Sequence, residues 1–467
     1  MADWLTRGCW ALWRHRCRRD VRHFRAALKN PEAAQAAQLR SILRLAEGSQ
    51  WAKKFGMNQA TTLEDFRARV PVQDPPRLTV WTDRIMRGET QVLSRAPLER
   101  LVPTSGTTGP SKLIPMNRES RREYAIAVNL WLHDCLAQCP AIMNGRAYIA
   151  TSPAIDPEPN ESAVPIGFAA DSAYLGYWEA RLLNRILAVP TQVTQQRGTA
   201  WRNATREHLF QASDLRFLSL WHPGYLEALF EPQEFAELRK RWKNLSLISC
   251  WSDGACRQQC DHLMAHFPRA RHHPKGLWLT EGAVTVPLGT HRPIALNSGF
   301  FEFEAADGTI LLAHQLDRNA HYRPILSNHA GLYRYRLGDK VRVDGHIGHT
   351  PSLHWVGRAD RVIDICGEKL SDAQIAIALG AVGWKQAFRI APIRDEHPPY
   401  YRCLVNETAS KFPIQAFETA LRRNPHYNWA RQIGQLAPLH VQAVIQSSLA
   451  EPITADQPQQ KVLYLCE

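Results

Sequence analysis

The chain has 467 residues, of which 45% are hydrophobic and 22% charged, so it can form two or three globular units with a sizeable core. It contains no run of about 18 apolar residues and no apolar segment typical of a secretory signal. We therefore expect a cytoplasmic protein without stable membrane insertion. Ten cysteines are too few for a disulfide scaffold in a chain of this length.

We interpret the cysteines as reduced and mostly buried thiols. Cys135 and Cys139, and likewise Cys256 and Cys260, are four residues apart, a spacing that could chelate a metal from one helix face. We consider that alternative the weaker one, because the sequence contains no CxxC pair.

The first 46 residues predict two helices with a break near Asn30-Pro31. Residues 1–29 carry eight Arg or Lys against two Asp, a large share of the net charge of +13, with four aromatic residues among them. We interpret this segment as a docking helix whose arginines are solvated. A basic aromatic helix could instead bind anionic lipid or nucleic acid.

The next elements follow from local signals. Residues 61–70 predict a short helix, since Thr61 can cap its first turn and Glu64 can complete a capping box. Further along we expect strands at 101–103 and 112–114, a helix of roughly 20 residues from Arg118, and buried strands at 146–152 and 245–250. Helical segments separate the buried strands, so the main body should be α/β with a central sheet.

The pattern changes in the last third of the chain. Residues 300–356 alternate as antiparallel strands do, with turns expected at Asp307-Gly308 and Asp344-Gly345. From Gly357 onward a small unit mixes strands (362–366, 402–406) with helices (371–380, 414–424). We therefore predict an α/β fold with a large domain over residues 1–356, including a β-rich subdomain, and a small mobile α+β domain over 357–467.

The most specific motif is the stretch of nine residues at 104–112, which links two expected strands. Two glycines let the backbone turn tightly, and successive N–H groups in such a turn can bind an anion. Hydroxyl groups and one lysine add further donors, which suits a triphosphate. The residues are Thr104, Ser105, Gly106, Thr107, Thr108, Gly109, Pro110, Ser111 and Lys112. The spacing is not that of a Walker A loop, and a plain polar hairpin turn is the alternative.

This stretch resembles the phosphate loop of the acyl-adenylate-forming superfamily. Three later motifs resemble those of that superfamily and stand in its order: Trp278-Leu-Thr280-Glu281-Gly282, Tyr333-Arg-Tyr-Arg-Leu-Gly338-Asp339, and Gly357-Arg358 through Lys369-Leu370.

Within the superfamily the chain resembles the GH3 branch of acyl acid–amido synthetases over nearly its whole length. The residues that carry this likeness are Phe66-Arg-Ala-Arg-Val-Pro71, Arg84-Ile-Met-Arg-Gly88-Glu89, Lys112-Leu-Ile-Pro115, Ser249-Cys-Trp251 and Asn424-Pro-His-Tyr427 with Arg431.

The resemblance implies a site for ATP and Mg²⁺. Thr280, Glu281 and Gly282 would serve the nucleotide, with Glu281 as the Mg²⁺ ligand, because Mg²⁺ favours one or two carboxylates plus substrate phosphates. Asp339 would bind the ribose hydroxyls and Arg358 the ribose or phosphate. Lys461 would reach the acyl carboxylate and the α-phosphate, although Gln-Gln precedes it where the GH3 pattern has Gly-Gln.

The acid-binding residues are less defined. We name Tyr124, Val128, Trp131 and Trp221-His222 as candidate walls, and Arg121 or Arg122 as a candidate partner for a substrate carboxylate. The predicted function is ATP-dependent adenylation of a carboxylic acid, followed by acyl transfer to an amino acid or another amine by a monomeric ligase. The alternatives are a thioester-forming acyl-CoA ligase, a nucleotide-binding protein without turnover, and a basic binding protein acting through residues 1–29.

Overall fold

The structure, a computed structural model, describes residues 4–104, 112–150, 162–167, 177–196, 198–253, 256–358, 362–384, 388–406 and 412–444. Ser105 to Gly109 and Lys461 lie outside these ranges. Backbone contacts divide the chain into two units, which are described separately. The first comprises Met1–Pro103, Leu113–Pro223 and Pro232–Ala359, and the second Thr104–Lys112, Gly224–Glu231 and Asp360–Glu467.

The N-terminal segment forms two helices that meet at the predicted break. Helix α1 spans Trp4–Lys29 and α2 spans Pro31–Ala46. The Asn30 side chain accepts a hydrogen bond from the backbone N–H of Ala33, and Pro31 occupies the first helical position, where no N–H is needed. Local sequence therefore places this helix boundary.

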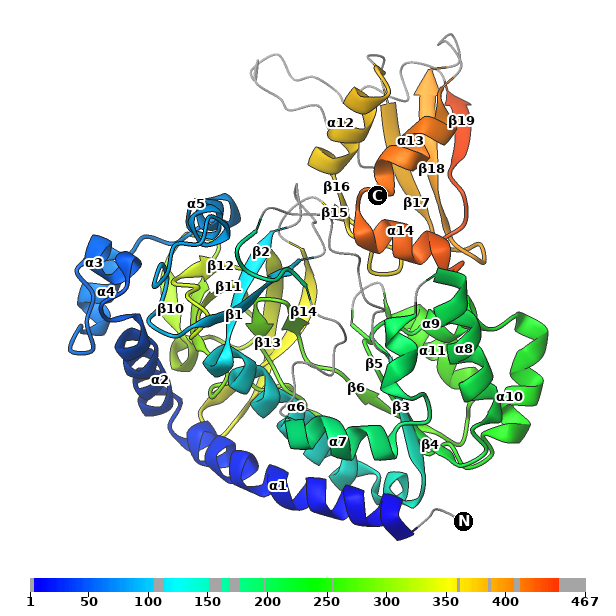
Figure 1. Cartoon of the computed structure of the whole chain (residues 1–467), viewed down its shortest axis with the longest axis horizontal. Helices are drawn as coiled ribbons and strands as arrows, with labels where there is room; N and C mark the ends of the chain where they lie inside the picture. Colours follow the sequence, from blue (N-terminus) through cyan, green and yellow to red (C-terminus); the bar gives the residue numbers. More distant parts are fainter. Residues whose placement is uncertain are drawn as a thin grey trace. The chain divides into compact units, whose positions relative to one another are not determined.

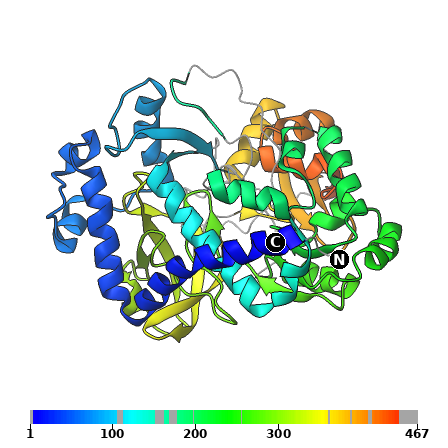
Figure 2. The same cartoon turned by 60° about the horizontal axis from the view of Figure 1, so that its bottom comes forward.

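Helix α1 packs on its neighbours through Trp10, Trp13 and Phe24, whereas Trp4 is exposed. It lies alongside α6, Arg118–Gln138 (Figure 2). The Trp10 indole donates to the carbonyl of Gly145, and Trp13 donates to Asn129. Both tryptophans are buried, as is Asp20, which accepts from Arg122 and Asn129. These contacts favour the docking interpretation, because the buried indoles cannot also insert into lipid.

Three short helices follow: α3, Gln50–Phe55; α4, Leu63–Arg69; and α5, Pro75–Met86.

The predicted cap of α4 is wrong by one residue. Thr62, not Thr61, accepts from the N–H of Asp65, whereas the Thr61 hydroxyl accepts from the N–H of Asn58. Thr61 thus closes the preceding turn and is not available to the helix.

A four-stranded parallel sheet, in the order β3-β4-β5-β6, forms the α/β part of the first unit (Figure 1). Its strands are Arg146–Ile149, Leu215–Ser219, Leu247–Cys250 and Arg271–Pro274. The intervening helices of this unit are α7, Tyr177–Ile186; α8, Gly198–Gln211; α10, Phe235–Arg241; and α11, Cys256–His266. Helix α9, Tyr225–Leu229, belongs to the second unit. The central strands are buried, as expected where helices cover both faces of a parallel sheet.

The pairing register of β5 and β6 divides their polar residues into two sets, one on each face of the sheet. Ser249 pairs with His273, and the Trp131 indole of α6 donates to the Ser249 hydroxyl at 3.0 Å. Cys250 points to the other face, as does His272, because successive strand residues alternate and His272 pairs with Ile248.

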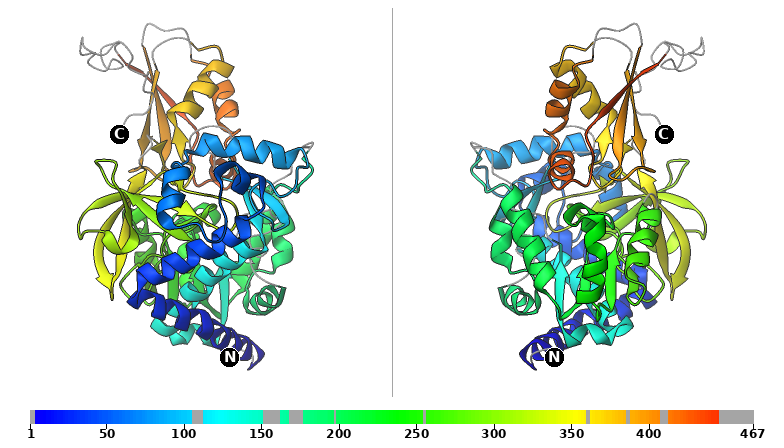
Figure 3. Two further views of the ribbon diagram at one scale, coloured as in Figure 1. Left: turned by 90° about the vertical axis from the view of Figure 1, so that its left-hand side faces the viewer. Right: turned by 90° about the vertical axis from the view of Figure 1, so that its right-hand side faces the viewer.

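An antiparallel sheet fills the predicted region 300–356 (Figure 3). Its strands are β9, Phe300–Glu304; β10, Ile310–Leu312; β11, His321–Ser327; β12, Tyr335–Arg336; β13, Asp339–Ile347; and β14, Thr350–Arg358. The turn predicted at Asp344-Gly345 is wrong. These residues lie inside β13, where the register with β14 shifts between Val343 and Gly345, so the glycine marks a bulge.

Two hairpins complete the unit: β1, Leu98–Pro103, with β2, Leu113–Asn117; and β7, Trp278–Leu279, with β8, Gly282–Ala283.

The second unit has its own core and its own sheet, β17-β18-β19, with α12 and α13 on one face (Figure 3). Rings of Phe388, Phe412 and Phe417 pack together in that core. Its elements are β15, Val362–Ile363; β16, Leu370–Ser371; α12, Asp372–Ala381; β17, Phe388–Ile393; β18, Tyr400–Asn406; α13, Ile414–Leu421; α14, Pro425–Gln432; and β19, His440–Val444.

His426 should make the second unit sensitive to acid. Burial, and then the charge of Lys369, lower the pKa of His426 to about 4 from 6.5. Below pH 6.5 the unfolded chain therefore binds the proton more readily, so stability is lost as the pH falls from about 6.5 towards 4. We expect wild type to lose about 1–2 kcal/mol more than His426→Phe between pH 7 and pH 5, measured by urea unfolding. Parallel stability profiles for the two proteins would contradict this assignment.

Candidate active site

The base of the predicted phosphate loop is closed by two hydrogen bonds. The Thr104 N–H donates to the Lys112 carbonyl at 2.7 Å, and the Lys112 N–H donates to the Thr104 hydroxyl at 3.2 Å. Pro103 and Leu113 are the last register pair of β1 and β2. The predicted strand–loop–strand arrangement is therefore present, and the loop residues 105–111 lie outside the described part.

Thr280 and Glu281 form the two-residue turn between β7 and β8, and both are partly exposed. Two features favour glycine as the next residue. Gly282 has φ +157°, and a Cβ at this position would lie 3.1 Å from Leu326. The tight hairpin thus fixes a hydroxyl and a carboxylate side by side.

Asn328 connects this hairpin with the segment that leads to Asp339. Its amide donates to the Glu281 carbonyl at 2.8 Å, while its side-chain oxygen accepts from the N–H groups of Ala330 and Leu332. The carbonyl of the next residue, His329, accepts from Asn117, the N-cap of α6. Two predicted motifs and the start of α6 are therefore held together by side-chain amides.

Asp339 begins β13 and pairs directly with Arg358 at the end of β14. The two predicted nucleotide ligands therefore lie opposite each other, although the Arg358 side chain lies outside the described residues. Asp339 is 3% exposed, and one of its carboxylate oxygens accepts from the Trp355 indole at 2.8 Å. This hydrogen bond fixes the carboxylate at the junction of the two strands.

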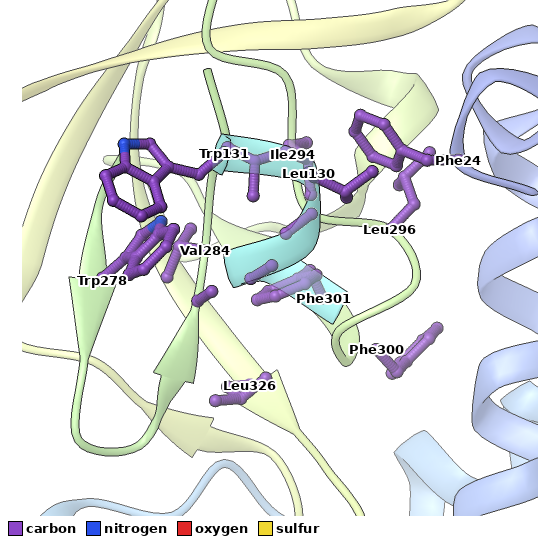
Figure 4. Packing of buried hydrophobic residues seen from close by; sticks show 14 of the residues in the cluster. Phe24, Leu130, Trp131, Trp278, Val284, Ile294, Leu296, Phe300, Phe301 and Leu326 are labelled. Carbon is purple, nitrogen blue, oxygen red and sulfur yellow. The ribbon is translucent and has the colours of Figure 1, made fainter. Parts of the chain in front are cut away.

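Aromatic side chains gather around Trp278, next to the Thr280-Glu281 turn. Trp131 and Trp278 lie side by side in Figure 4, with ring centroids 6.0 Å apart. Tyr124 and Trp221 contact Trp278 at 5.6 and 6.1 Å. We call these four residues and Trp251, which packs on Trp221, the aromatic cluster. The structure thus brings together three residues that the sequence suggested separately as walls of an acid site.

Lys275 is buried within the aromatic cluster. Its ammonium lies 4.3 Å from the ring centroid of Trp221 and 4.7 Å from that of Trp131, and it donates to the Ser219 hydroxyl at 2.9 Å. Ser219 ends β4 and Lys275 follows β6, so both lie at the carboxyl edge of the parallel sheet. Ligands of open α/β sheets bind outside that edge.

The arginines proposed to hold the substrate carboxylate are engaged elsewhere. Arg121 forms a two-pronged ion pair with Glu99, and Arg122 pairs with Asp20. Both pairs fasten α6 to its neighbours, so the structure assigns these arginines a structural role.

The GH3-like motif at residues 66–71 and the superfamily motif at residues 333–339 meet at one buried carboxylate. Glu302 is 0% exposed and accepts from Arg67 at 2.8 Å and from Arg334 at 2.9 and 3.2 Å. Arg334 also donates to the carbonyls of Arg67 and Val70. These arginines hold the β-rich sheet to the C-terminal end of α4, so their role is structural.

Two further GH3-like motifs also stabilise local structure. Arg84 pairs with Glu89 across the end of α5. In the second unit, Asn424 caps α14 and donates to the Glu368 carbonyl, while Arg431 pairs with Glu418. Motif recognition therefore identified the family, but not which of these residues do chemistry.

The fold is that of adenylate-forming ligases. A GH3.15 acyl acid amido synthetase in complex with 2,4-DB superimposes with a TM-score of 0.67 at 15% identity, covering 97% of this chain and 94% of that one. A 2-hydroxyisobutyryl-CoA ligase in complex with 2-HIB-AMP and CoA gives a TM-score of 0.57 at 15% identity, covering 94% and 91%.

The chain belongs to the GH3 family. Residues 20–223 match the GH3 family N-terminal domain and residues 293–358 the GH3 family central domain, which together make up more than half of the chain. It is similar to the putative indole-3-acetic acid-amido synthetase GH3.10 of Oryza sativa subsp. japonica, with 22% identity over 77% of this chain and 85% of that protein. The predicted family and fold class are confirmed.

None of the helices in the described part of the chain combines the length and apolar character needed to cross a bilayer.

Proposed function

We propose that this GH3 family member is an ATP-dependent ligase that activates a carboxylic acid as an acyl-adenylate and transfers the acyl group to an amine. The observation that carries the proposal is the Thr280-Glu281 hairpin, joined through Asn328 to the segment that leads to Asp339. The rice relative supports the amide product, since it is named as an amido synthetase.

The chemistry has two balanced half-reactions. A carboxylate oxygen of the acid attacks the α-phosphorus of ATP, and the bond to pyrophosphate breaks. The amine nitrogen then attacks the acyl carbonyl, AMP leaves with the bonding electrons, and the amine loses a proton. The first step needs positive charge and Mg²⁺ around the phosphates.

The predicted residues fit these needs. Glu281 and Thr280 offer partly exposed oxygen donors on one turn, the type of ligand that Mg²⁺ prefers, and a bound Mg²⁺ would neutralise phosphate charge there. Residues 104–112 would bind the phosphates, and Asp339 with Arg358 would bind the ribose. Lys461 would contact the acyl carboxylate and α-phosphate from a small domain, residues 357–467, that moves relative to a large domain, residues 1–356.

The aromatic cluster and Lys275 would form the acid-binding region. Indole faces provide apolar surface for an aromatic or aliphatic acid, and the ammonium offers a donor to a polar group on it. Its place beside Thr280 and at the carboxyl edge of the sheet supports this assignment.

Lys275→Met should separate acid binding from nucleotide binding. Losing a hydrogen bond from a charged donor costs about 1.5–3 kcal/mol, so we expect KM for the acid to rise roughly 10-fold to 100-fold. KM for ATP should stay within about twofold, because Lys275 is assigned to the acid alone. Steady-state kinetics give both values, with the exposed Lys240→Met as the matched control. Equal increases in both constants would show that Lys275 supports the fold in general.

Acid-dependent pyrophosphate release by the purified full chain tests the proposed function. We expect release with Mg²⁺-ATP and one member of a broad acid panel, and an amide detected by mass spectrometry when amino acids are added. Release with CoA as the productive acceptor would identify a thioester-forming ligase instead. ATP binding without release across the whole panel, by folded protein, would favour a nucleotide-binding protein without turnover.

We further propose that the enzyme acts as a monomer in the cytoplasm. Gel filtration with light scattering and fractionation of cells that produce the protein test these two points.

A further inference from the structure

Two thiols and an imidazole converge on the face of the parallel sheet that points away from α6. Cys250 ends β5, His272 lies on the neighbouring strand β6, and Cys260 comes from α11. The register places Cys250 and His272 on the same face, because His272 pairs with Ile248 and side chains alternate along each strand. The three ligand atoms lie within 4.8 Å of one another.

The distance between the two sulfur atoms matches a metal better than a disulfide. The Sγ atoms of Cys250 and Cys260 are 3.8 Å apart. Two thiolates bound tetrahedrally to zinc, with Zn–S distances of about 2.3 Å, stand about 3.8 Å apart. A disulfide would require about 2.05 Å. The thiols are thus spaced as tetrahedral ligands before any metal is added.

The third ligand is suited to complete the set. The Nε2 atom of His272 is buried and makes no hydrogen bond within the described ranges, so one ring nitrogen remains for a ligand. Cys250 and Cys260 are 0% and 3% exposed, which shields the sulfurs from solvent oxidants.

We propose that Cys250, Cys260 and His272 bind one Zn²⁺ ion that ties α11 to the carboxyl edge of the parallel sheet. Two thiolates and one imidazole form a borderline-soft donor set that suits zinc, with a fourth position left for water or another ligand.

The metal would fix the position of Trp251, which belongs to the aromatic cluster. Cys250 directly precedes Trp251 of the aromatic cluster, and Trp251 packs on Trp221. Asp253, two residues further, pairs with Arg292. A zinc ion would therefore fix both ends of the link between β5 and α11. This role is structural and does not depend on the proposed reaction.

Metal analysis of the full chain tests the proposal. The protein is produced without a metal-binding tag, purified under reducing conditions, and analysed by inductively coupled plasma mass spectrometry. We expect about one zinc per chain in wild type and below about 0.2 in Cys260→Ser and His272→Asn. Cobalt replacing the zinc should give thiolate-to-metal charge-transfer bands that both variants lose.

Controls distinguish loss of the site from loss of the fold. Cys139→Ser, another buried thiol of the same unit, should keep the zinc. Circular dichroism checks that each variant is folded, and a strong chelator should lower the Tm of wild type but not of Cys260→Ser. Wild type without stoichiometric zinc, zinc retained by both variants, or a Cys250–Cys260 disulfide in protein isolated anaerobically would overturn the proposal.

Discussion

Glu281→Gln lowers acid-dependent pyrophosphate release by at least about 100-fold while leaving the fold intact, if the carboxylate has the role proposed for it. The substitution keeps the size of the side chain and removes the charge that would hold Mg²⁺ against the phosphates. The turn itself survives, because Asn328 binds the backbone carbonyl of Glu281 and not its carboxylate. Stopped-flow or coupled measurement of pyrophosphate, at several Mg²⁺ concentrations, gives the rate and the apparent affinity for the metal.

Asp307→Asn is the matched control for this experiment. Asp307 also lies in a hairpin turn, between β9 and β10, and its carboxylate accepts from the backbone N–H of Thr309. We expect the control to retain the wild-type rate within about twofold, because the turn lies outside the proposed nucleotide site. A Glu281→Gln enzyme with more than half of the wild-type rate at every Mg²⁺ concentration would rule out Glu281 as the metal ligand.

Glu302→Gln produces the largest expected loss of stability. Glu302 is fully buried between the guanidinium groups of Arg67 and Arg334, whose side chains are 28% and 6% exposed. Removing the negative charge leaves two guanidinium groups next to each other without the carboxylate that neutralises them. Breaking a buried ion pair in this way typically costs about 3–5 kcal/mol. Urea unfolding followed by tryptophan fluorescence measures the change for the first unit, which contains Arg67, Glu302 and Arg334.

Glu304→Gln provides the comparison on the same strand. Glu304 pairs with Arg336, which also pairs with Asp74, at side-chain exposures of 15% and 22% for Glu304 and Arg336. Arg336 keeps Asp74 as a partner after the substitution, so we expect a loss of about 1 kcal/mol or less. Equal destabilisation by the two variants would show that burial between two arginines does not set the cost at Glu302.

Local elements of the fold could be predicted because their signals lie within a few residues. Asn30-Pro31 ends one helix and starts the next, since a side-chain cap and a missing N–H act on the adjacent turn. The two strands around residues 104–112 follow from short patterns in the same way. One local signal gave a wrong prediction. The Asp344-Gly345 pair is typical of a turn, but in the structure it lies within β13 and forms a bulge against β14.

The candidate site was predictable only in part. Glu281 and Asp339 were identified from motifs, whereas Asn328, which joins the segments that contain them, carries no recognisable signal. Lys275 was missed because a lysine after a strand is ordinarily solvated, and only the surrounding indoles reveal its burial. The ion pairs of Arg121 and Arg122 were equally hidden, since their partners are remote in sequence.

The sequence by itself determined the family, the α/β class, the order of most elements and the stretches proposed to bind the nucleotide. Only the tertiary structure decided that Glu302 joins two arginines 235 and 32 residues away, that three indoles surround Lys275, and that Cys250 faces Cys260 and His272. The physical reason is the range of the interactions. Caps, turns and periodicity act between neighbouring residues, whereas ion pairs, ring contacts and metal ligands depend on strand register and on which side chains become buried together.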